Sequence, residues 1–272
     1  MRVSELNIYP VKSLKGITLQ EAGIEDRVFR YDRRWMLVDE NGKFLTQREF
    51  PVMARISVAV GADALDVSFG DSRLSVPFDV PDNGGPKRVR IWASLVKAEF
   101  YSDELDQWFS DALRTKCRLA AMTDVSKRLV NPYYSIHKFR DTVSFADGYP
   151  FLLIGQGSLD DLNSRLENKV LMNRFRPNIV VEGSPAFAED TWKKIRIGST
   201  IFHVVKPCAR CVMPTIDQTT GEKTGVEPLR TLASYRTKRN KVLFGQNLIA
   251  DEAGGTLRIG DEVEVLETRL RT

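Results

Sequence analysis

Short runs of valine, isoleucine and aromatic residues, separated by turn residues, recur through the first hundred positions of the chain. The runs lie at 34–38, 55–60, 64–69, 73–76, 88–92 and 95–101. Strands of this length and spacing are typical of antiparallel meanders or a barrel, whereas βαβ units would place helical patterns between the strands. The pattern therefore predicts a mostly β N-terminal part.

Helical spacing of apolar residues is found at three places. The segments are 102–113, 158–166 and 228–235. Ser102 is expected to cap the first helix, and Ser158 is expected to form a capping box with Asp161 on the second. Pro228 suits the first turn of the third helix.

Glycine-centred turns at 198–199 and 260–261 indicate two hairpins in the C-terminal part of the chain. Their strands are expected at 194–197 with 200–205, and at 257–259 with 263–266. A further strand is expected at 178–182. The expected fold class is therefore α+β and β-rich, with a barrel-like sheet and a few peripheral helices.

Composition places the chain among soluble globular proteins. Its 272 residues suffice for one large or two small domains, and contents of 42% hydrophobic and 28% charged residues are ordinary for that class. The net charge of +4 is a mild excess and no long run of Lys or Arg is present, which argues against nucleic-acid binding. A small anionic ligand fits this charge balance better.

The cysteine content and the N-terminus indicate a reducing compartment. Three cysteines are too few for a disulfide framework, and the first residues lack an apolar signal core. No segment reaches the roughly 18 apolar residues of a membrane span. We therefore expect a cytoplasmic protein that does not contact a membrane.

The segment most suggestive of chemistry is KPCARC at 206–211, which follows an apolar run. It places Cys208 and Cys211 beside two cations, Lys206 and Arg210, and behind a proline that is expected to end the strand. A neighbouring cation favours the thiolate, the form of cysteine that binds metals and attacks electrophiles. One of the two sulfurs is therefore expected to bind a metal or react, rather than only to pack in the structure.

Three kinds of site use such a pair of cysteines. A zinc site would need a second pair of ligands, and the chain otherwise offers only Cys117, His137 and His203. A thioredoxin-like pair would need to open a helix in a βαβ unit, whereas the motif here follows a strand and leads into Val-Met-Pro-Thr. The third kind is a single thiolate ligand to a soft metal, with neighbouring residues that hold an anionic cofactor.

Other segments carry polar residues that a plain strand or turn would not need. Lys12 and Ser13 lie in a turn that can offer an ammonium, a hydroxyl and backbone N–H groups to a phosphate. The remaining residues of this kind are Arg33 before a strand, Asp147 in an apolar turn, and Arg176 with Asn178 before a strand. Taken singly, each also fits an ordinary loop or turn.

Six blocks, taken in this order, resemble the MOSC-domain family, and most closely the branch of the amidoxime-reducing components and their bacterial relatives. The blocks are YPVKSLKG (9–16), DRRWMLVD (32–39), FADGYPFLL (145–153), FRPNIVV (175–181), KPCARC (206–211) and FGQNLIA (244–250). The resemblance spans nearly the whole chain. It implies a β-rich N-terminal MOSC region at 1–100 and a MOSC domain, a β-barrel, at 101–268.

Members of this family bind the molybdenum cofactor, a pterin whose dithiolene sulfurs hold molybdenum and whose far end is a phosphate. The resemblance implies that Cys211 is the protein's ligand to molybdenum and that Cys208 is not. It also implies a catalytic part for Asp147, as the position for proton delivery. The implied cofactor contacts are Lys12, Ser13 and Arg33 around the phosphate, Asp147, Arg176 and Asn178 along the pterin and metal, and Ala209, Arg210 and Asn247 in flanking segments.

The resemblance further implies an enzyme that reduces small N-hydroxylated compounds to N–H compounds and water. The chain has no C-x4-C-x2-C ferredoxin motif, so the electrons are expected from a separate donor protein of the ferredoxin or flavin reductase type. Two alternatives stay open. One is a non-catalytic cofactor carrier or sulfur-transfer protein that uses the same cysteine, and the other is a phosphate-binding domain that holds no metal.

Overall fold

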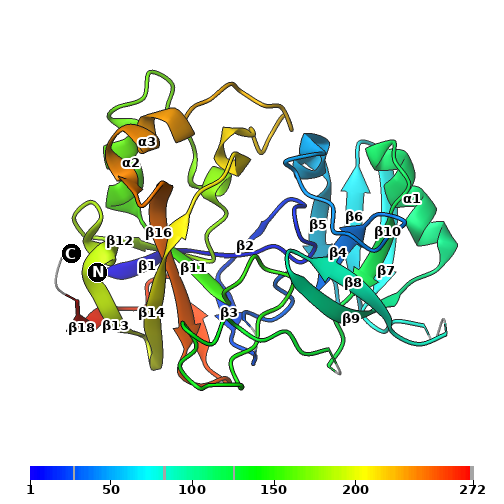
Figure 1. Ribbon diagram of the computed structural model, residues 1–272, viewed down its shortest axis with the longest axis horizontal. Coiled ribbons are helices and arrows are strands. Elements are labelled where there is room, and N and C mark those ends of the chain that lie inside the picture. Colours follow the sequence, from blue (N-terminus) through cyan, green and yellow to red (C-terminus); the bar gives the residue numbers. More distant parts are fainter. Residues whose placement is uncertain (27, 82–83, 125, 270–272) are drawn as a thin grey trace.

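The computed structural model describes residues 1–272 apart from 27, 82–83, 125 and 270–272. Two lobes lie side by side, a larger one built on a nine-stranded sheet and a smaller one built on two sheets of N-terminal strands (Figure 1). The fold is α+β and rich in strands, as the sequence predicted, with three α-helices in the described part of the chain. None of the helices within those residues has the length and apolarity to cross a membrane.

The nine-stranded sheet has the order β18-β13-β14-β16-β11-β12-β1-β2, and β15 pairs with β16 beside that path. Its strands are β1 (Arg2–Ile8), β2 (Ile17–Leu19), β11 (Phe151–Gly155), β12 (Ile179–Glu182), β13 (Trp192–Ile197), β14 (Thr200–Ala209), β15 (Thr237–Lys238), β16 (Lys241–Ala250) and β18 (Val263–Thr268). Of these pairs, β11 and β12 run parallel and the others antiparallel. The sheet thus joins the start of the chain to its C-terminal half.

Side chains on the two faces of this sheet form separate cores, because successive residues of a strand point to opposite faces. On one face, Phe29, Phe151 and Phe202 meet edge to face, with ring centroids 5.0 and 5.3 Å apart. The other face is covered by α2 (Gln156–Asn163) and α3 (Leu229–Arg236), which lie together above the sheet in Figure 1. A rigid double-sided sheet therefore supports the strand ends that lead into the site.

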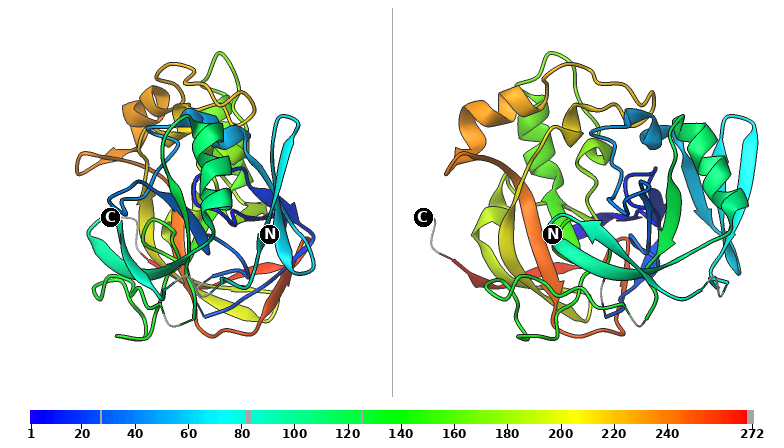
Figure 2. Two further views of the ribbon diagram at one scale, coloured as in Figure 1. Left: turned by 90° about the vertical axis from the view of Figure 1, so that its right-hand side faces the viewer. Right: turned by 45° about the vertical axis from the view of Figure 1, so that its right-hand side comes forward.

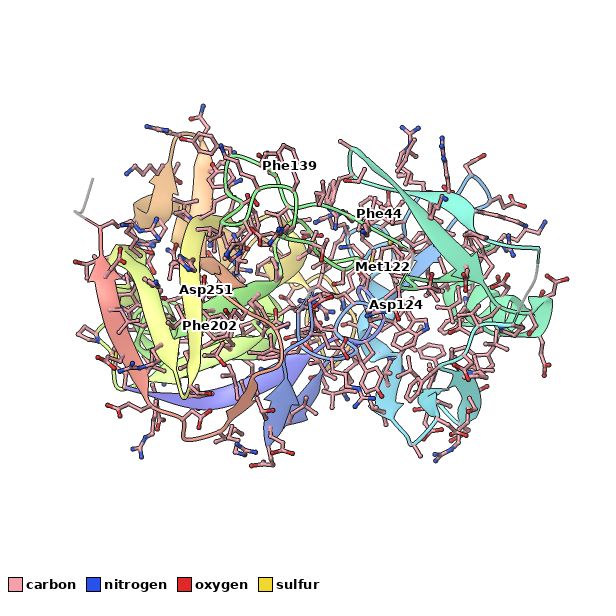
Figure 3. All side chains as sticks on the ribbon, turned by 90° about the horizontal axis from the view of Figure 1, so that it is seen from below. Phe44, Met122, Asp124, Phe139, Phe202 and Asp251 are labelled. Carbon is pink, nitrogen blue, oxygen red and sulfur yellow. The ribbon has the colours of Figure 1, made fainter. Side chains whose placement is uncertain are left out.

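The smaller lobe combines the sheet β4-β10-β9-β8 with the meander β5-β6-β7. Its strands are β4 (Trp35–Val38), β5 (Ser57–Val60), β6 (Ala64–Phe69), β7 (Ser72–Pro77), β8 (Lys87–Ile91), β9 (Ser94–Phe100) and β10 (Arg118–Ala121). Helix α1 (Asp103–Leu113) covers the outer side, where Figure 2 brings it to the front, and buries Phe109 and Leu113. Phe44 and Met122, labelled in Figure 3, belong to the core cluster on the other face of the four-stranded sheet.

The lobes take elements from both regions that the resemblance implied. Strand β1, which opens the chain, belongs to the large sheet, while α1 and β10, which follow residue 100, pack in the small lobe. The boundary at residue 100 between the N-terminal MOSC region and the MOSC domain stays a prediction.

The predicted hairpin around Gly260-Asp261 is wrong. Asp261 Oδ2 does accept a hydrogen bond from the backbone N–H of Arg258 at 2.7 Å, as in a tight turn. However, β17 (Thr256–Arg258) pairs with β3 (Glu21–Gly23), and β18 pairs with β13. The two strands that flank the turn therefore belong to different sheets.

The predicted capping of the helices is also corrected. Helix α2 begins at Gln156 and ends at Asn163, earlier than predicted, so Ser158 lies inside it. Ser158 Oγ donates to Glu189 Oε1 at 2.7 Å and forms no capping box with Asp161. Ser102 does precede α1, but its side chain makes no capping hydrogen bond.

Strand β14 does not end at Pro207, as the sequence suggested, but continues to Ala209. Its register against β16 shifts between Val204 and Lys206, and again between Pro207 and Ala209. Such bulges accommodate a proline, which has no N–H to donate to the ladder. The strand therefore carries Cys208 to the edge of the candidate site.

Candidate cofactor site

A cleft of about 280 Å3 brings together turns from the N-terminal segments and strand ends of the large sheet. All ten residues that the resemblance implied for the site line this cleft. They are Lys12, Ser13, Arg33, Asp147, Arg176, Asn178, Ala209, Arg210, Cys211 and Asn247. The sequence therefore predicted a set of residues that the fold does gather, and their roles stay predictions.

Three of these residues hold the backbone in the left-handed region that residues other than glycine rarely adopt. The φ angles are 68° at Ser13, 50° at Arg33 and 55° at Arg176. Each such conformation costs about 1–3 kcal/mol, and residues of this kind gather at functional sites. Arg176, for example, ends the 3-10 helix η2 (Met172–Phe175) and turns the chain toward β12. Sharp turns thus form the cleft wall.

Arg33 is held at the cleft by four partners. Its Nη1 lies 2.6 Å from Asp32 Oδ2 and donates to Asn178 Oδ1 at 3.2 Å, and its Nη2 donates to the carbonyl of Arg176 at 3.3 Å. The guanidinium also lies 4.4 Å from the ring centroid of Tyr9. Burial raises the pKa of Asp32, which is fully buried, and Arg33 opposes that rise. Arg33 is therefore a cation of fixed direction.

Arg176 stacks on the same aromatic ring as Arg33. Its guanidinium lies 4.1 Å from the ring centroid of Tyr9, and its Nη1 donates to Gln218 Oε1 at 3.4 Å. Burial lowers the pKa of Arg176 to about 10 and raises the pKa of Tyr9 to about 12. At neutral pH both guanidinium groups are thus charged around a neutral phenol, an arrangement that an anionic ligand would stabilise.

Lys12 and Asp147 form an ion pair whose two sides differ in exposure. Lys12 Nζ lies 2.6 Å from Asp147 Oδ1, and the side chain of Lys12 is 7% exposed against 65% for Asp147. Burial lowers the pKa of Lys12 to about 8, although Asp147 opposes the change. Desolvation raises the pKa of Asp147, but Lys12 and Arg48 outweigh it and hold that pKa well below its usual range. Asp147 is therefore ionised at neutral pH, while Lys12 is protonated.

The two cysteines of the motif have different surroundings. Cys211 is half-buried in the cleft, and Arg48 Nε donates to its Sγ at 3.3 Å. Burial raises the pKa of the Cys208 thiol, whose Sγ lies 3.9 Å from the carbonyl of Ala209. A hydrogen bond from a cation favours a thiolate, whereas burial disfavours one. Cys211 is thus the thiol with a cation at its sulfur, and its role as metal ligand stays a prediction.

The cation beside Cys211 is not one of its neighbours in sequence. Lys206 Nζ lies 4.6 Å from an aromatic ring centroid, and Arg210 donates to two backbone carbonyls at 2.8 and 2.9 Å. Arg48, 163 positions before Cys211, contacts the sulfur instead. The sequence patterns considered above did not single out Arg48, because its partner is distant in the chain. The hydrogen bond to the Cys211 sulfur therefore comes from Arg48, and the expectation that Lys206 and Arg210 also act on this thiol stays a prediction.

The cations that line the cleft suit an anion. Lys12, Arg33 and Arg176 all line it, and cations with directed N–H groups bind phosphate strongly. Over the described residues, no group of three His, Cys, Asp or Glu side chains could hold a metal ion. These cations and the two cysteines that line the cleft, Cys208 and Cys211, fit a phosphate-bearing cofactor with a soft metal.

Known proteins are similar in sequence to this chain along nearly its whole length. Residues 1–116 match the MOSC N-terminal beta barrel domain, and residues 140–264 match the MOSC domain. Mitochondrial amidoxime-reducing component 1 of Mus musculus is 34% identical, over 97% of this chain and 82% of that protein. Mitochondrial amidoxime reducing component 2 of Homo sapiens is 35% identical, over 96% and 82%. Molybdenum cofactor sulfurase of Oryza sativa is 32% identical, over 97% of this chain and 35% of that protein.

The two domain matches cover the turns and strand ends that line the cleft. Lys12, Ser13 and Arg33 fall in the first match, and Asp147 and Cys211 fall in the second. Identity of about a third over almost the entire chain is well above what unrelated sequences share. The chain therefore belongs to the MOSC-domain family, as a protein with both the N-terminal and the MOSC domain that is related to the amidoxime-reducing components.

Proposed function

We propose that the chain is a molybdenum-cofactor-dependent reductase of small N-hydroxylated compounds, with electrons from a separate donor protein. The observation that carries the proposal is that a half-buried thiol with a cation at its sulfur, Cys211, shares a cleft with the buried Lys12 and Arg176 and the largely buried Arg33. The relatives named for amidoxime reduction match 96–97% of the length of this chain, which supports the proposal.

Each part of the cleft has a task in this proposal. Lys12, Ser13 and Arg33 hold the phosphate of the cofactor, since cations with directed N–H groups bind phosphate most strongly, and Arg176 lies along the pterin. Cys211 provides the thiolate that a soft metal prefers. When bound, the cofactor supplies a metal that exchanges two electrons, while the protein supplies binding, orientation and electrostatics.

The reaction needs two electrons and two protons for each N–OH group. The N–O bond breaks, the oxygen leaves as water, and the nitrogen gains a hydrogen. The electrons come from a donor of the ferredoxin or flavin reductase type. Lys12 Nζ is protonated at neutral pH because its pKa is about 8, and its ion pair with Asp147 Oδ1 at 2.6 Å places this N–H beside the group proposed for proton delivery. Asp147 is exposed at the mouth of the cleft, where solvent can replace the proton.

Two measurements on freshly purified protein test the proposal. Plasma mass spectrometry should find stoichiometric molybdenum, and loaded protein with a chemical reductant should convert benzamidoxime to benzamidine. Cys211→Ser serves as the control and should show neither. A fully loaded sample that fails to reduce benzamidoxime would contradict the proposal. Protein that binds phosphate but never acquires molybdenum would favour the metal-free phosphate-binding alternative.

A cofactor carrier or sulfur-transfer protein is the second candidate, because the similarity to Molybdenum cofactor sulfurase covers 97% of this chain. It would use the same Cys211, either as an anchor or as a persulfide. Such a protein would release molybdenum to an apo-enzyme and reduce nothing. Transfer to an apo-enzyme, measured together with the absence of benzamidoxime turnover, would decide in its favour.

A further inference from the structure

An exposed tryptophan stands at the turn between β8 and β9. Trp92 is 45% exposed, and its φ of 54° places it in the left-handed region. Its ring packs against Phe44, with centroids 4.9 Å apart; Figure 3 labels Phe44 in the small lobe. A turn position of this kind favours glycine or asparagine, and a large exposed aromatic residue there is costly. The position therefore calls for a reason other than turn geometry.

The ring face and the Nε1–H group of the Trp92 indole both contact side chains at the cleft. The Arg48 guanidinium lies 4.6 Å from the ring centroid of Trp92, and Trp92 Nε1 donates to Asp147 Oδ1 at 3.2 Å. Arg48 in turn donates to Cys211 Sγ at 3.3 Å, and its Nη2 lies 3.7 Å from Asp147 Oδ2. Trp92 thus contacts the two side chains that stand between the thiol and the small lobe.

We propose that Trp92 is a positioning residue that holds Arg48 over the Cys211 sulfur. The side chains of Trp92 and Arg48 together form a wall beside this sulfur. The wall limits the size of the molecules that can reach the sulfur. The wall is contributed by the small lobe, whereas the thiol belongs to the large lobe. That the sulfur marks the reacting centre rests on the proposed function. The position of the wall rests only on the contacts of Trp92, Arg48 and Asp147.

The small volume of the cleft makes the wall important for which substrates can enter. At about 280 Å3 the cleft lies just below the range of about 300–1,000 Å3 for small-molecule sites. The same cleft must hold the proposed cofactor, so a substrate must approach over the rim. A rim fixed by Trp92 admits small or flat N-hydroxylated compounds and excludes branched ones.

Alkylation of Cys211 in the cofactor-free full chain measures this access directly. A small reagent, iodoacetamide, and a bulky one, N-pyrenylmaleimide, are compared in each variant, because the ratio of the two rates cancels any change in the reactivity of the thiol. Arg210 lies between Cys208 and Cys211, so tryptic peptides report the two thiols separately. Cys117, which is 3% exposed in the core, reports global opening from a second digest.

Trp92→Ala should raise the bulky-to-small ratio at Cys211 about tenfold, as expected from losing one cation–π contact and one hydrogen bond to a carboxylate. Trp92→Phe keeps the aromatic face, so its bulky-to-small ratio at Cys211 should stay close to that of the parent protein. Leu95→Ala is the matched control, because Leu95 is 57% exposed on the same hairpin, and it should leave the ratio unchanged. Labelling of Cys117 should stay negligible in all three variants.

An unchanged ratio in Trp92→Ala, or an equal rise in Leu95→Ala, would overturn the inference. A rise that Trp92→Phe does not reverse would also count against it, since stacking on Arg48 would then not hold the wall. Labelling at Cys117 that rises together with labelling at Cys211 would assign the effect to unfolding and reject the wall. Because the cofactor is absent from these measurements, a rise in the ratio in a chain that never reduces benzamidoxime would keep the wall and reject the proposed function.

Discussion

Replacing Arg33 with methionine should destabilise the protein in a pH-dependent way, even without a cofactor. Methionine is close in length to the arginine stem, so it removes the guanidinium and keeps most of the stem packing. The partner left behind, Asp32, is 0% exposed, and the Arg33 side chain is 12% exposed. Removing one side of a buried ion pair costs about 3–5 kcal/mol, because an uncompensated charge stays inside. The hydrogen bonds of Arg33 to Asn178 and to the Arg176 carbonyl are lost as well.

The sign of the pH dependence follows from the carboxyl group of Asp32. Burial already raises its pKa, and the loss of Arg33 raises it further. In the variant the folded state therefore binds more protons than the unfolded state at pH values above the unfolded pKa of about 3.9. Stability falls as pH rises through this window and levels off above the folded pKa. The difference between variant and parent should thus be largest at about pH 8 and smallest at about pH 5.

Urea unfolding at several pH values measures this difference. A loss of about 3 kcal/mol lowers the urea midpoint by about 1 M or more, with an unchanged slope. Arg30→Met is the control, because Arg30 is 64% exposed and lies 3.7 Å from Glu25, a surface pair worth about 0.2–1 kcal/mol. A loss at Arg33 that matches the loss at Arg30, or that does not vary with pH, would refute the reasoning that Asp32 depends on Arg33.

Three further outcomes are expected. Cys211→Ser should abolish molybdenum binding and benzamidoxime reduction, because a hydroxyl is a poorer ligand for a soft metal. Cys208→Ser should keep most of both. Equal losses in the two variants, in metal analysis and in turnover, would indicate a dithiol mechanism. Because the pKa of Lys12 is about 8, inorganic phosphate should bind cofactor-free protein about tenfold more weakly at about pH 9.5 than at about pH 7. Calorimetry that shows the same pH dependence in Lys12→Met would contradict this assignment. Gly245→Ala should lower stability by about 2 kcal/mol or more, since φ is +78° and a Cβ would lie 2.8 Å from a backbone carbonyl. Gly70→Ala, where φ is +58° and no atom lies within 4 Å of the added Cβ, should lower stability less. Thermal unfolding of the two variants measures the difference.

The sequence predicted elements whose partners lie next to them in the chain. The meander β5-β6-β7 and the hairpins β8–β9 and β13–β14 agree with the prediction, because each pairs across a short turn. Helix α1 was predicted because its apolar spacing is local. Strands β1, β11 and β16 were missed. They lie in the interior of the nine-stranded sheet, and a strand buried on both faces lacks the alternation that identifies a strand in a single sequence.

The same limit explains the wrong hairpin around Gly260-Asp261. The turn forms, but β17 pairs with β3 and β18 pairs with β13, from opposite parts of the chain. Turn residues determine how the chain reverses, not which edge the following strand joins. Local patterns therefore predicted turns more reliably than strand pairing.

The site shows both what sequence proximity can predict and where it fails. Ser13, Arg33 and Arg176 were found through short motifs, and all three hold a strained left-handed backbone that packing alone would not select. The cation beside Cys211 was assigned to Lys206 and Arg210 because they adjoin it in sequence, yet Arg210 is bound to backbone carbonyls. Arg48 reaches the sulfur from 163 positions away, because the small lobe folds against the strand ends of the large sheet. A thiol whose cation comes from the other lobe depends on how the two lobes pack, so substitutions in the β8–β9 turn can change the reactive sulfur without touching its own motif.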